Sequence, residues 1–269
     1  MKTFKKSLGQ NFLVDQNIKN KIIKFINIKK NDIIIEIGAG EGSISKEISN
    51  LSKKSYFIEI DKCFIQELSN VINNKKSTIH NDNILKFNIK DIIKKHKKIR
   101  IIGNLPYNIS TKIIMFLTNF LKNIKDLHFL VQKEIAEKIL KNKCKNNKIS
   151  IKLEYFFKTE KIYDIKPHSF NPKPKIMSSF IKLTPKKNKN EINDIKLFDE
   201  LLNKIFNNKG KKTKNLFKNI NDKLIKNENI TSKNISLKDI LEIYKEIKNE
   251  KEERSEEHTS ELQSPCNLV

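Results

Sequence analysis

The sequence is poor in cysteine and in long hydrophobic runs, and each shortage excludes a class of protein. Its three cysteines, Cys63, Cys144 and Cys266, lie far apart and lack C-x-x-C spacing, which argues against a disulfide framework and a zinc site. No apolar stretch reaches the length of a membrane span. The first motif follows Met1 almost directly, which leaves no room for a targeting peptide. We therefore expect a cytoplasmic protein with free thiols, no membrane partner and no metal.

Arginine is almost absent, although the chain is strongly basic. Arg100 and Arg254 are the two arginines among 55 basic residues, and the formal net charge is +24. Abundant lysine, asparagine and isoleucine are typical of an A+T-rich genome, so part of the lysine reflects composition. A charge of this size still attracts polyanions, and nucleic acid is the predicted partner. An anionic membrane surface is disfavoured, because no basic amphipathic helix with aromatic anchors stands out.

Short apolar runs alternate with helical patterns over the first part of the chain. Strands are predicted at residues 33–37, 56–60, 78–80, 99–102 and 127–131, and helices at 43–51, 61–68, 110–121 and 133–140. This alternation predicts an α/β fold with a doubly wound, mostly parallel sheet. Residues 151–157 and 177–183 are predicted to close the sheet as an antiparallel pair. Pro167, Pro172 and Pro174 break regular structure between them.

The rest of the chain is predicted to be helical. After a polar linker at 186–193, one helical face carries the apolar residues Leu197, Phe198, Leu201, Leu202, Ile205 and Phe206. Ser236 and Asp239 form a capping-box pattern that starts a helix over 237–247. We therefore expect a large domain at 1–185 and a small helical domain at 194–250.

Residues 254–269 differ in composition from everything before them. Lysine disappears, and glutamate, serine, histidine and proline replace the lysine, asparagine and isoleucine of the preceding chain. The segment from Arg254 to Ser264 resembles a translated reading frame of a common sequencing adapter. We interpret 254–269 as a non-native tail, with a genuine disordered tail as the alternative.

A glycine-rich turn follows the first predicted strand. Its pattern is Glu36-x-Gly38-x-Gly40-x-Gly42, and glycine at such a turn lets the backbone approach a ligand closely. Glu59 ends the next strand, where a carboxylate can accept hydrogen bonds from a ribose diol. The carboxyl ends of these parallel strands lie at one edge of the sheet, which is where ligands bind in open α/β folds.

The glycine pattern alone suits either a dinucleotide or S-adenosylmethionine. The E-x-G-x-G spacing lacks the third glycine of G-x-G-x-x-G, and Asp82 ends the third strand, where it could accept from an adenine amine. Both features favour S-adenosylmethionine. Two alternatives stay open: Glu36 as a structural carboxylate and Asp82 as the start of an Asx turn.

The tetrapeptide Asn104-Leu105-Pro106-Tyr107 closes the fourth predicted strand. The Asn104 side chain and the Leu105 carbonyl can accept hydrogen bonds from the exocyclic amine of a base. Pro106 fixes φ and removes a competing donor, and Tyr107 offers a stacking face. The alternative is a tight turn whose aromatic side chain packs in the core.

These motifs together resemble the ribosomal RNA adenine dimethyltransferases. That group includes the small-subunit dimethyladenosine transferases and the erythromycin-resistance methyltransferases. The similarity covers roughly residues 7–217, and GNLPYNIS at 103–110 carries it. The other matching segments are LGQNFL at 8–13, IEIGAG at 35–40, EID at 59–61, QKE at 132–134 and FNPKPK at 170–175.

The resemblance implies a seven-stranded class I methyltransferase sheet and assigns roles to individual residues. S-adenosylmethionine is expected to contact Asn11, Leu13, Gly38, Gly40, Glu59, Asp82 and Asn104. Asn104, Leu105, Pro106 and Tyr107 are expected to hold the target adenine, which must leave its stack to enter the site. Phe170 is a candidate for the opposite face of the base. The alternatives are a polar loop residue for Asn11 and a packed loop aromatic for Phe170.

In the family, an arginine-rich stretch opens a helix at the place where this chain has Lys209, Lys211, Lys212 and Lys214. Lysine neutralises phosphate but lacks the bidentate fork of arginine, so charge contact is expected to survive with less geometric specificity. The helical domain at 194–250 is therefore expected to bind RNA, and the alternative is a solvated helix start. A second departure is Asn147-Lys148-Ile149-Ser150, where the family usually has Tyr-Gly-Arg before Leu-Ser.

The expected function is S-adenosylmethionine-dependent N6,N6-dimethylation of two adjacent adenines near the 3′ end of small-subunit rRNA during ribosome biogenesis. The expected partner is the immature small subunit, with the enzyme as a monomer. The nearest rival is a resistance-type methyltransferase of large-subunit rRNA. A rival from another class is a non-catalytic assembly or transcription factor with the same fold, against which the intact Asn104–Tyr107 loop argues.

Overall fold

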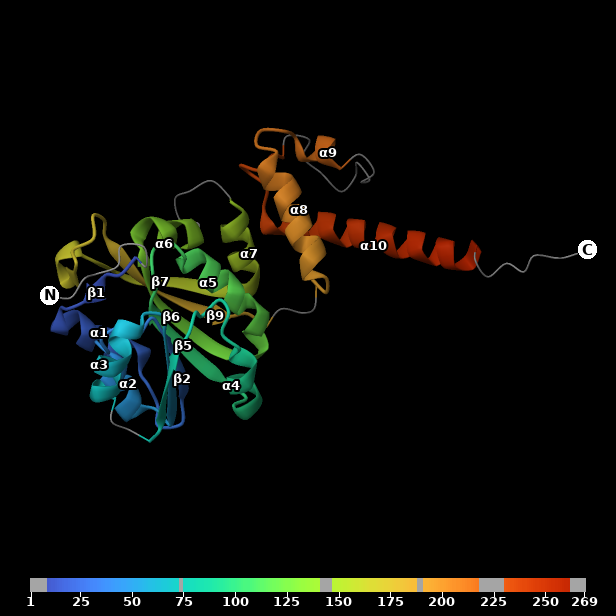
Figure 1. The fold of residues 1–269 in the computed structure, drawn as a ribbon. Coiled ribbons are helices and arrows are strands. Elements are labelled where there is room, and N and C mark those ends of the chain that lie inside the picture. Colours follow the sequence, from blue (N-terminus) through green and yellow to red (C-terminus); the bar gives the residue numbers. More distant parts are fainter. Residues whose placement is uncertain (1–8, 73–74, 141–146, 188–190, 218–229, 262–269) are drawn as a thin grey trace, which may run out of the picture. The chain divides into compact units, whose positions relative to one another are not determined.

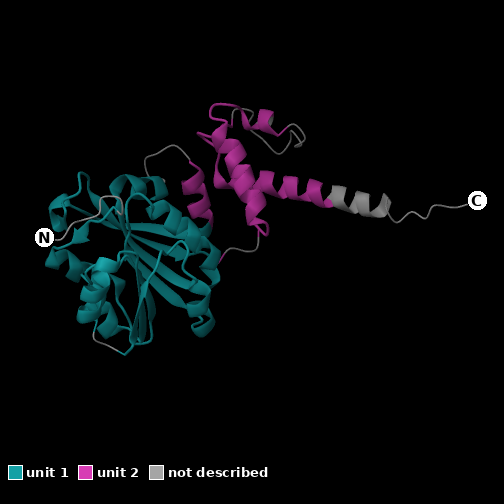
Figure 2. Ribbon diagram, in the orientation of Figure 1, with its two compact units in different colours: residues 1–140, 156–186 teal, residues 141–155, 187–269 magenta. Residues whose placement is uncertain are grey.

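The computed structural model describes residues 9–72, 75–140, 147–187, 191–217 and 230–261. The chain divides into two compact units, which Figure 2 distinguishes by colour. Unit 1 comprises residues 1–140 and 156–186, and unit 2 comprises residues 141–155 and 187–269. Residues 141–155, which the sequence assigned to the first domain, therefore group with unit 2.

Unit 1 is built on a seven-stranded sheet with the order β4-β3-β2-β5-β6-β9-β7. Its strands are β2 (Ile33–Ile37), β3 (Lys54–Glu59), β4 (Ser77–Asn81), β5 (Ile99–Asn104), β6 (Ile124–Gln132), β7 (Phe157–Ile165) and β9 (Ser178–Pro185). β2 to β6 pair in parallel, whereas β9 is antiparallel to both of its neighbours. A separate pair joins β1 (Phe12–Leu13) to β8 (Phe170–Asn171). The predicted doubly wound, mostly parallel sheet is confirmed.

Helices of unit 1 cover both faces of this sheet (Figure 1). They are α1 (Gln16–Ile26), α2 (Ser45–Leu51), α3 (Ile65–Val71), α4 (Ile89–Lys95), α5 (Ser110–Leu117) and α6 (Lys133–Leu140), with short 3₁₀ turns at Lys62–Phe64, Thr118–Asn123 and Pro167–Ser169. The predicted helix over 110–121 thus ends at Leu117 and continues as a 3₁₀ turn. Within the described residues, no helix is long and apolar enough to cross a membrane.

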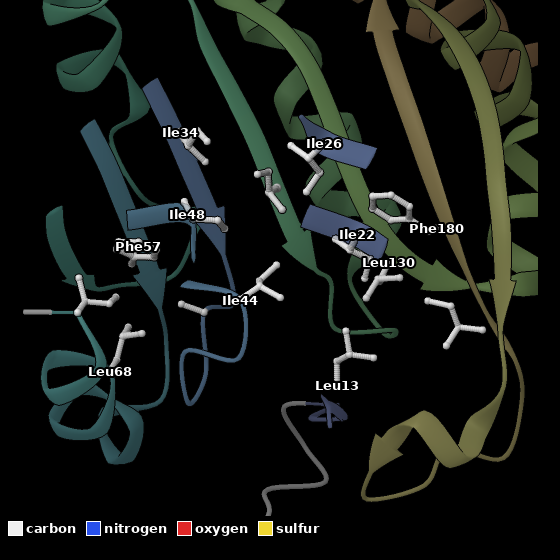
Figure 3. Close-up of a cluster of buried hydrophobic side chains, with 14 of the residues drawn as sticks. Leu13, Ile22, Ile26, Ile34, Ile44, Ile48, Phe57, Leu68, Leu130 and Phe180 are labelled. Atoms are coloured by element: carbon white, nitrogen blue, oxygen red, sulfur yellow. The ribbon is translucent and has the colours of Figure 1, made fainter. Parts of the chain in front are cut away.

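The core of unit 1 joins helices α1, α2 and α3 to one face of the sheet. Ile22, Ile48 and Leu68 from the helices belong to one cluster with Ile34 and Phe57 from the strands (Figure 3). All five residues of β2 are buried, because a central parallel strand is covered by helices on both sides. This packing holds the strand ends in fixed positions at both edges of the sheet.

The predicted strand at 151–157 is wrong, because this segment forms most of helix α7 (Lys148–Phe156). Its alternating apolar and polar residues imitate a strand. Asn147 and Ser150 form a reciprocal cap: the Ser150 N–H donates to Asn147 Oδ1 at 2.9 Å, and the Asn147 N–H donates to Ser150 Oγ at 3.2 Å. This cap favours a helix start, and the strand that pairs with β9 is β7 instead.

Unit 2 is helical, with α8 (Ile195–Asn207), α9 (Thr213–Leu216) and α10 (Leu237–Glu261) besides α7. Leu197, Phe198, Leu201, Leu202 and Ile205 are buried in one cluster, and Phe206 packs against it. The predicted capping box is confirmed, since the Ser236 N–H donates to Asp239 Oδ2 at 2.8 Å and the Asp239 N–H to Ser236 Oγ at 3.2 Å.

Helix α10 continues to Glu261, so the backbone of residues 254–261 is helical. Residues 262–269 lie outside the described residues. The interpretation of 254–269 as a non-native tail stays a prediction.

Candidate active site

A cavity with an empty volume of about 720 Å³ opens at the carboxyl edge of the sheet, where β2, β3, β4 and β5 end. Predicted site residues from distant parts of the chain line it together: Asn11, Gly38, Gly40, Glu59, Asp82, Asn104, Leu105, Pro106 and Tyr107. The doubly wound topology produces this convergence, because parallel strands bring their carboxyl ends to one edge.

The turn after β2 depends on glycine for its shape. Gly38 and Gly40 have φ values of 72° and 52°, in the left-handed region that other residues rarely adopt. A Cβ on Gly40 would lie 2.6 Å from the ring of Phe12, so space as well as backbone conformation requires glycine there. The backbone can therefore approach a ligand closely at this turn.

Glu59 is buried at the end of β3, and backbone groups fix its carboxylate. Oε2 accepts from the Gly40 N–H at 2.8 Å, and Oε1 accepts from the Asp61 N–H at 2.8 Å. Burial raises the pKa of Glu59, and the nearby Asp61 adds to that rise, whereas the backbone hydrogen bonds oppose it. Each oxygen keeps a further lone pair, so the carboxylate can still accept from a ligand diol.

Glu36 lies behind the glycine turn rather than in the cavity wall. Its Oε2 accepts from Ser45 Oγ at 2.7 Å, and burial raises its pKa to about 8. This agrees with the structural alternative for Glu36, although its partner is a hydroxyl and not a backbone amide.

The orientation of the Asn104 amide follows from its partner. Nδ2 donates to the backbone carbonyl of Asn11 at 2.6 Å, which leaves Oδ1 as the acceptor of the side chain. Leu105 is buried, and its N–H donates to the Leu130 carbonyl at 3.1 Å. The loop after β5 is therefore held at both residues, with an amide oxygen at the cavity.

Tyr107 has a partner that the sequence did not indicate. Its hydroxyl lies 2.6 Å from the hydroxyl of Ser178, which begins β9 and is fully buried. Burial raises the pKa of Tyr107, and the bond to Ser178 opposes that rise. Ser178 belongs to no recognisable motif. It lies 71 residues from Tyr107 in the chain, and only the folded sheet brings the two together.

Two predicted site residues do not reach the cavity wall. Leu13 and Phe170 pair across β1 and β8, and both side chains are buried in the core cluster. Phe170 is 3% exposed, so an incoming base would have to displace packed core to stack on it. This burial favours the packed-aromatic alternative for Phe170, and its stacking role stays a prediction.

Asn11 and Asp82 lie at the cavity with local hydrogen bonds of their own. Asn11 Nδ2 donates to the Gly9 carbonyl at 3.2 Å, and Asp82 Oδ1 accepts from the Asn83 N–H at 2.6 Å. Asp82 is exposed, so its second oxygen is accessible to a ligand amine.

Sequence reasoning missed the apolar part of the wall, which includes Phe12, Ile60, Phe64 and Ile84. The rings of Phe12 and Phe64 lie with centroids 5.0 Å apart, and Ile60 and Ile84 line the cavity beside the strand ends. Ile60 follows Glu59 directly, and Ile84 lies two residues after Asp82. Their positions just after an acidic residue at a strand end could have indicated that they line the site.

The lysine stretch lies in unit 2. Lys209, Lys211 and Lys212 are exposed around the turn between α8 and α9, and Lys212 forms an isolated antiparallel bridge with Thr231. The backbone of Lys214 belongs to α9, and its side chain lies outside the described residues.

Within the described residues, no group of three or more His, Cys, Asp or Glu residues could hold a metal ion.

Solved structures share this architecture. A dimethyladenosine transferase from Plasmodium falciparum aligns with a TM-score of 0.73 at 24% identity, covering 86% of this chain and 95% of that one. The 23S rRNA methyltransferase ErmE aligns with a TM-score of 0.70 at 15% identity, covering 87% and 98%. The seven-stranded sheet is that of the class I methyltransferase fold.

Sequence comparison narrows this class to one family. The family profile described as "Ribosomal RNA adenine dimethylase" matches residues 1–249. A relative from Francisella tularensis subsp. tularensis, "Ribosomal RNA small subunit methyltransferase A", is 38% identical over 220 residues, which are 80% of this chain and 84% of the relative. The Francisella tularensis subsp. novicida protein of the same name matches equally well. The chain belongs to the ribosomal RNA adenine dimethylase family, and it is an rRNA adenine dimethyltransferase.

Proposed function

We propose that this enzyme uses S-adenosylmethionine to dimethylate N6 of two adjacent adenines near the 3′ end of small-subunit rRNA during ribosome biogenesis in the cytoplasm. The relatives with 38% identity bear a small-subunit name, which supports the choice of subunit. The enzyme acts as a monomer on the immature small subunit.

The orientation of Asn104 carries this proposal. Because Nδ2 is committed to the Asn11 carbonyl at 2.6 Å, Oδ1 accepts one hydrogen of the adenine amine. The Leu105 carbonyl is the second acceptor. Two acceptors bias the amine nitrogen toward a tetrahedral geometry and so localise its lone pair, and positioning of this kind can contribute several kcal/mol.

Tyr107 stacks on the target base, and Ser178 holds the tyrosine hydroxyl in place. A fixed ring costs less entropy when the base enters than a mobile ring would. Pro106 stiffens the loop between the two contacts. No ionised general base is needed before the transfer, because the neutral amine is the nucleophile.

Residues of the cavity wall supply acceptors for the polar groups of the cofactor. Glu59 accepts from the ribose diol, Asp82 from the adenine amine, and the turn of Gly38 and Gly40 lets the backbone approach. When bound, S-adenosylmethionine supplies a methyl group activated by its positive sulfonium. Glu59 and Asp82 at the cavity favour a cationic ligand over the anionic pyrophosphate of a dinucleotide.

In unit 2, the residues that contact RNA are Lys209, Lys211, Lys212 and Lys214. Exposure of the first three supports phosphate binding in place of the arginines that the family uses here. Their role is to hold the RNA, while the Asn104–Tyr107 loop performs the chemistry.

One experiment separates this proposal from its two rivals. The protein is incubated with S-adenosylmethionine labelled in the methyl group and with immature small subunits or large subunits, and the modified bases are mapped. N6,N6-dimethyladenine at two neighbouring positions of small-subunit rRNA is the expected product. A single modified adenine in large-subunit rRNA would identify a resistance-type enzyme. Subunit binding without methyl transfer would identify a non-catalytic factor.

A further inference from the structure

The amino edge of the sheet, opposite the cavity, is crowded with lysine. We define this edge by the five segments that lead into the parallel strands: 29–32, 53–54, 75–76, 95–98 and 122–125. Four of them contain two lysines each, and 95–98 contains three. All of these lysines are exposed except Lys54, which is half-buried.

Hydrogen bonds join the five segments into one continuous surface. The Lys53 N–H donates to the Asp32 carbonyl at 3.0 Å, and the Ser55 N–H to the Lys76 carbonyl at 3.1 Å. Lys98 Nζ donates to the Lys122 carbonyl at 2.8 Å. The ion pair of Lys125 with Asp32, at 3.0 Å, joins the fifth segment to the first. The lysines therefore act as one patch rather than as five separate loops.

Negative charge on this edge is internal. Asp32 is the one acidic residue in the five segments, and Asp126 directly follows the last segment. Both are 7% exposed and bound to Arg100. Lys98 donates to a neutral carbonyl, which leaves its charge uncompensated. Lys53, Lys54 and Lys95 together lower the pKa of His96, in addition to burial, so lysines of different segments share one positive field. Compositional bias toward lysine does not explain the lack of exposed carboxylates.

We propose that the amino edge is a second RNA-binding surface, which contacts phosphates of the small-subunit rRNA far from the target adenines. This inference rests on the proposed function, because it takes the same particle as substrate. Phe25 and Leu51 are the exposed large apolar residues near this edge, too few beside eleven lysines to anchor a membrane, so an RNA partner fits better. A strand such as β2 spans about 17 Å, so a short RNA in the cavity does not reach this edge, whereas a ribosomal particle does.

The test compares two triple variants that remove the same charge. The edge variant is Lys30→Gln, Lys53→Gln and Lys97→Gln, and the control variant is Lys21→Gln, Lys46→Gln and Lys90→Gln, which are exposed positions outside the edge. For immature small subunits, the edge variant is expected to bind about tenfold more weakly at low salt. Its log–log salt slope should be reduced by about 2, since each lost contact removes 0.7–0.9. The control variant should keep the wild-type slope, and a short hairpin with the target adenines should bind all three proteins equally.

Other outcomes would overturn the proposal. Equal salt slopes for the edge and control variants would mean that the edge does not contact RNA. The same conclusion would follow if the edge lysines were needed for binding to anionic vesicles but not for binding to subunits. Equal weakening on the hairpin would place the lysines at the cavity RNA instead. Methylation of the subunits by the wild-type protein is measured in parallel, so that the two proposals can fail separately. If the subunits are methylated but the edge and control variants have equal slopes, the edge proposal alone is rejected. If the slopes differ but no methylation occurs, the proposed function alone is rejected.

Discussion

The pKa values of buried carboxyl groups shift in opposite directions at the two edges of the sheet. At the carboxyl edge, Glu36 and Glu59 are buried without a cationic partner in the described chain, and their pKa values are raised, to about 8 for Glu36. At the amino edge, burial of Asp126 is outweighed by hydrogen bonds from His128 and Arg100, and its pKa falls to about 2. The difference has a physical cause: the carboxyls at the cavity lack a cationic partner among the described residues, so burial favours their protonated form, whereas Arg100 keeps the buried carboxylates of the opposite edge ionised.

Arg100 is the centre of the stabilising edge. Its guanidinium donates to Asp32 at 2.7 Å, to Asp126 at 2.8 Å and to the Ile26 carbonyl at 2.7 Å, which ties α1 to β5 and β6. Three partners in different directions require the planar fork that lysine lacks. This requirement gives a physical reason for an arginine in a chain that otherwise uses lysine.

The largest expected effect is on stability at the amino edge. Arg100→Ala leaves two buried carboxylates uncompensated and should lower the free energy of unfolding by about 3–5 kcal/mol. Urea denaturation measures this loss, and Arg100→Lys should recover part of it. The folded fraction should bind S-adenosylmethionine normally, and a lost cofactor affinity would show that the two edges are not independent.

The next effect is on chemistry at the carboxyl edge. Asn104→Ala removes an acceptor that acts on the amine in the reacting complex, so single-turnover methylation should fall by about 10²–10³-fold. RNA affinity and melting temperature should change little. Near-normal single-turnover rates would mean that the loop after β5 has a structural role only.

Cofactor binding should depend on the Glu59 charge. Glu59→Ala is expected to cost about 1.5–3 kcal/mol of binding free energy, because a buried diol loses a charged acceptor. Titration calorimetry checks this, with Glu59→Gln as the matched variant that keeps an acceptor without the charge. Unchanged affinity in both variants would reject the ribose assignment.

The Ser178–Tyr107 bond can be isolated with a double-mutant cycle. Ser178→Ala and Tyr107→Phe should each raise the KM for RNA more than they lower kcat. The rise in KM should correspond to about 0.5–1.5 kcal/mol. The double variant should be no worse than either single one, since both remove the same bond. Additive losses would mean that Ser178 acts through packing and not through the tyrosine hydroxyl.

A further expected effect is a pH dependence of the unfolding free energy that comes from Glu36. The folded protein keeps this proton up to about pH 8, whereas the unfolded chain releases it near the ordinary value of 4.5. Between these pH values the unfolded state binds fewer protons, so this group makes stability fall as pH rises, with a slope of at most about 1.4 kcal/mol per unit. Glu36→Gln should flatten the fall seen in denaturation between pH 5 and 8, and an unaltered slope would contradict the raised pKa.

Most of the fold and much of the cavity could be predicted from local patterns. The buried run at 33–37, the glycine turn and the N-L-P-Y loop each follow from backbone chemistry that operates within a few residues. The segment 151–157 could not, because its alternation suits a strand while the cap formed by Asn147 and Ser150 favours a helix. The burial of Phe170 could not be predicted for a related reason: a motif reports residue type, whereas burial depends on what packs around the residue.

The sequence by itself determined the alternation of strands and helices, the acidic and glycine residues at the strand ends, and the family. These depend on chemistry between near neighbours. Only the tertiary structure decided which acceptor atom of Asn104 is available, that Ser178 holds Tyr107, and that lysines from five separate segments form one surface. Each of these depends on contacts between residues far apart in the chain, whose geometry exists once the sheet has brought its strand ends together.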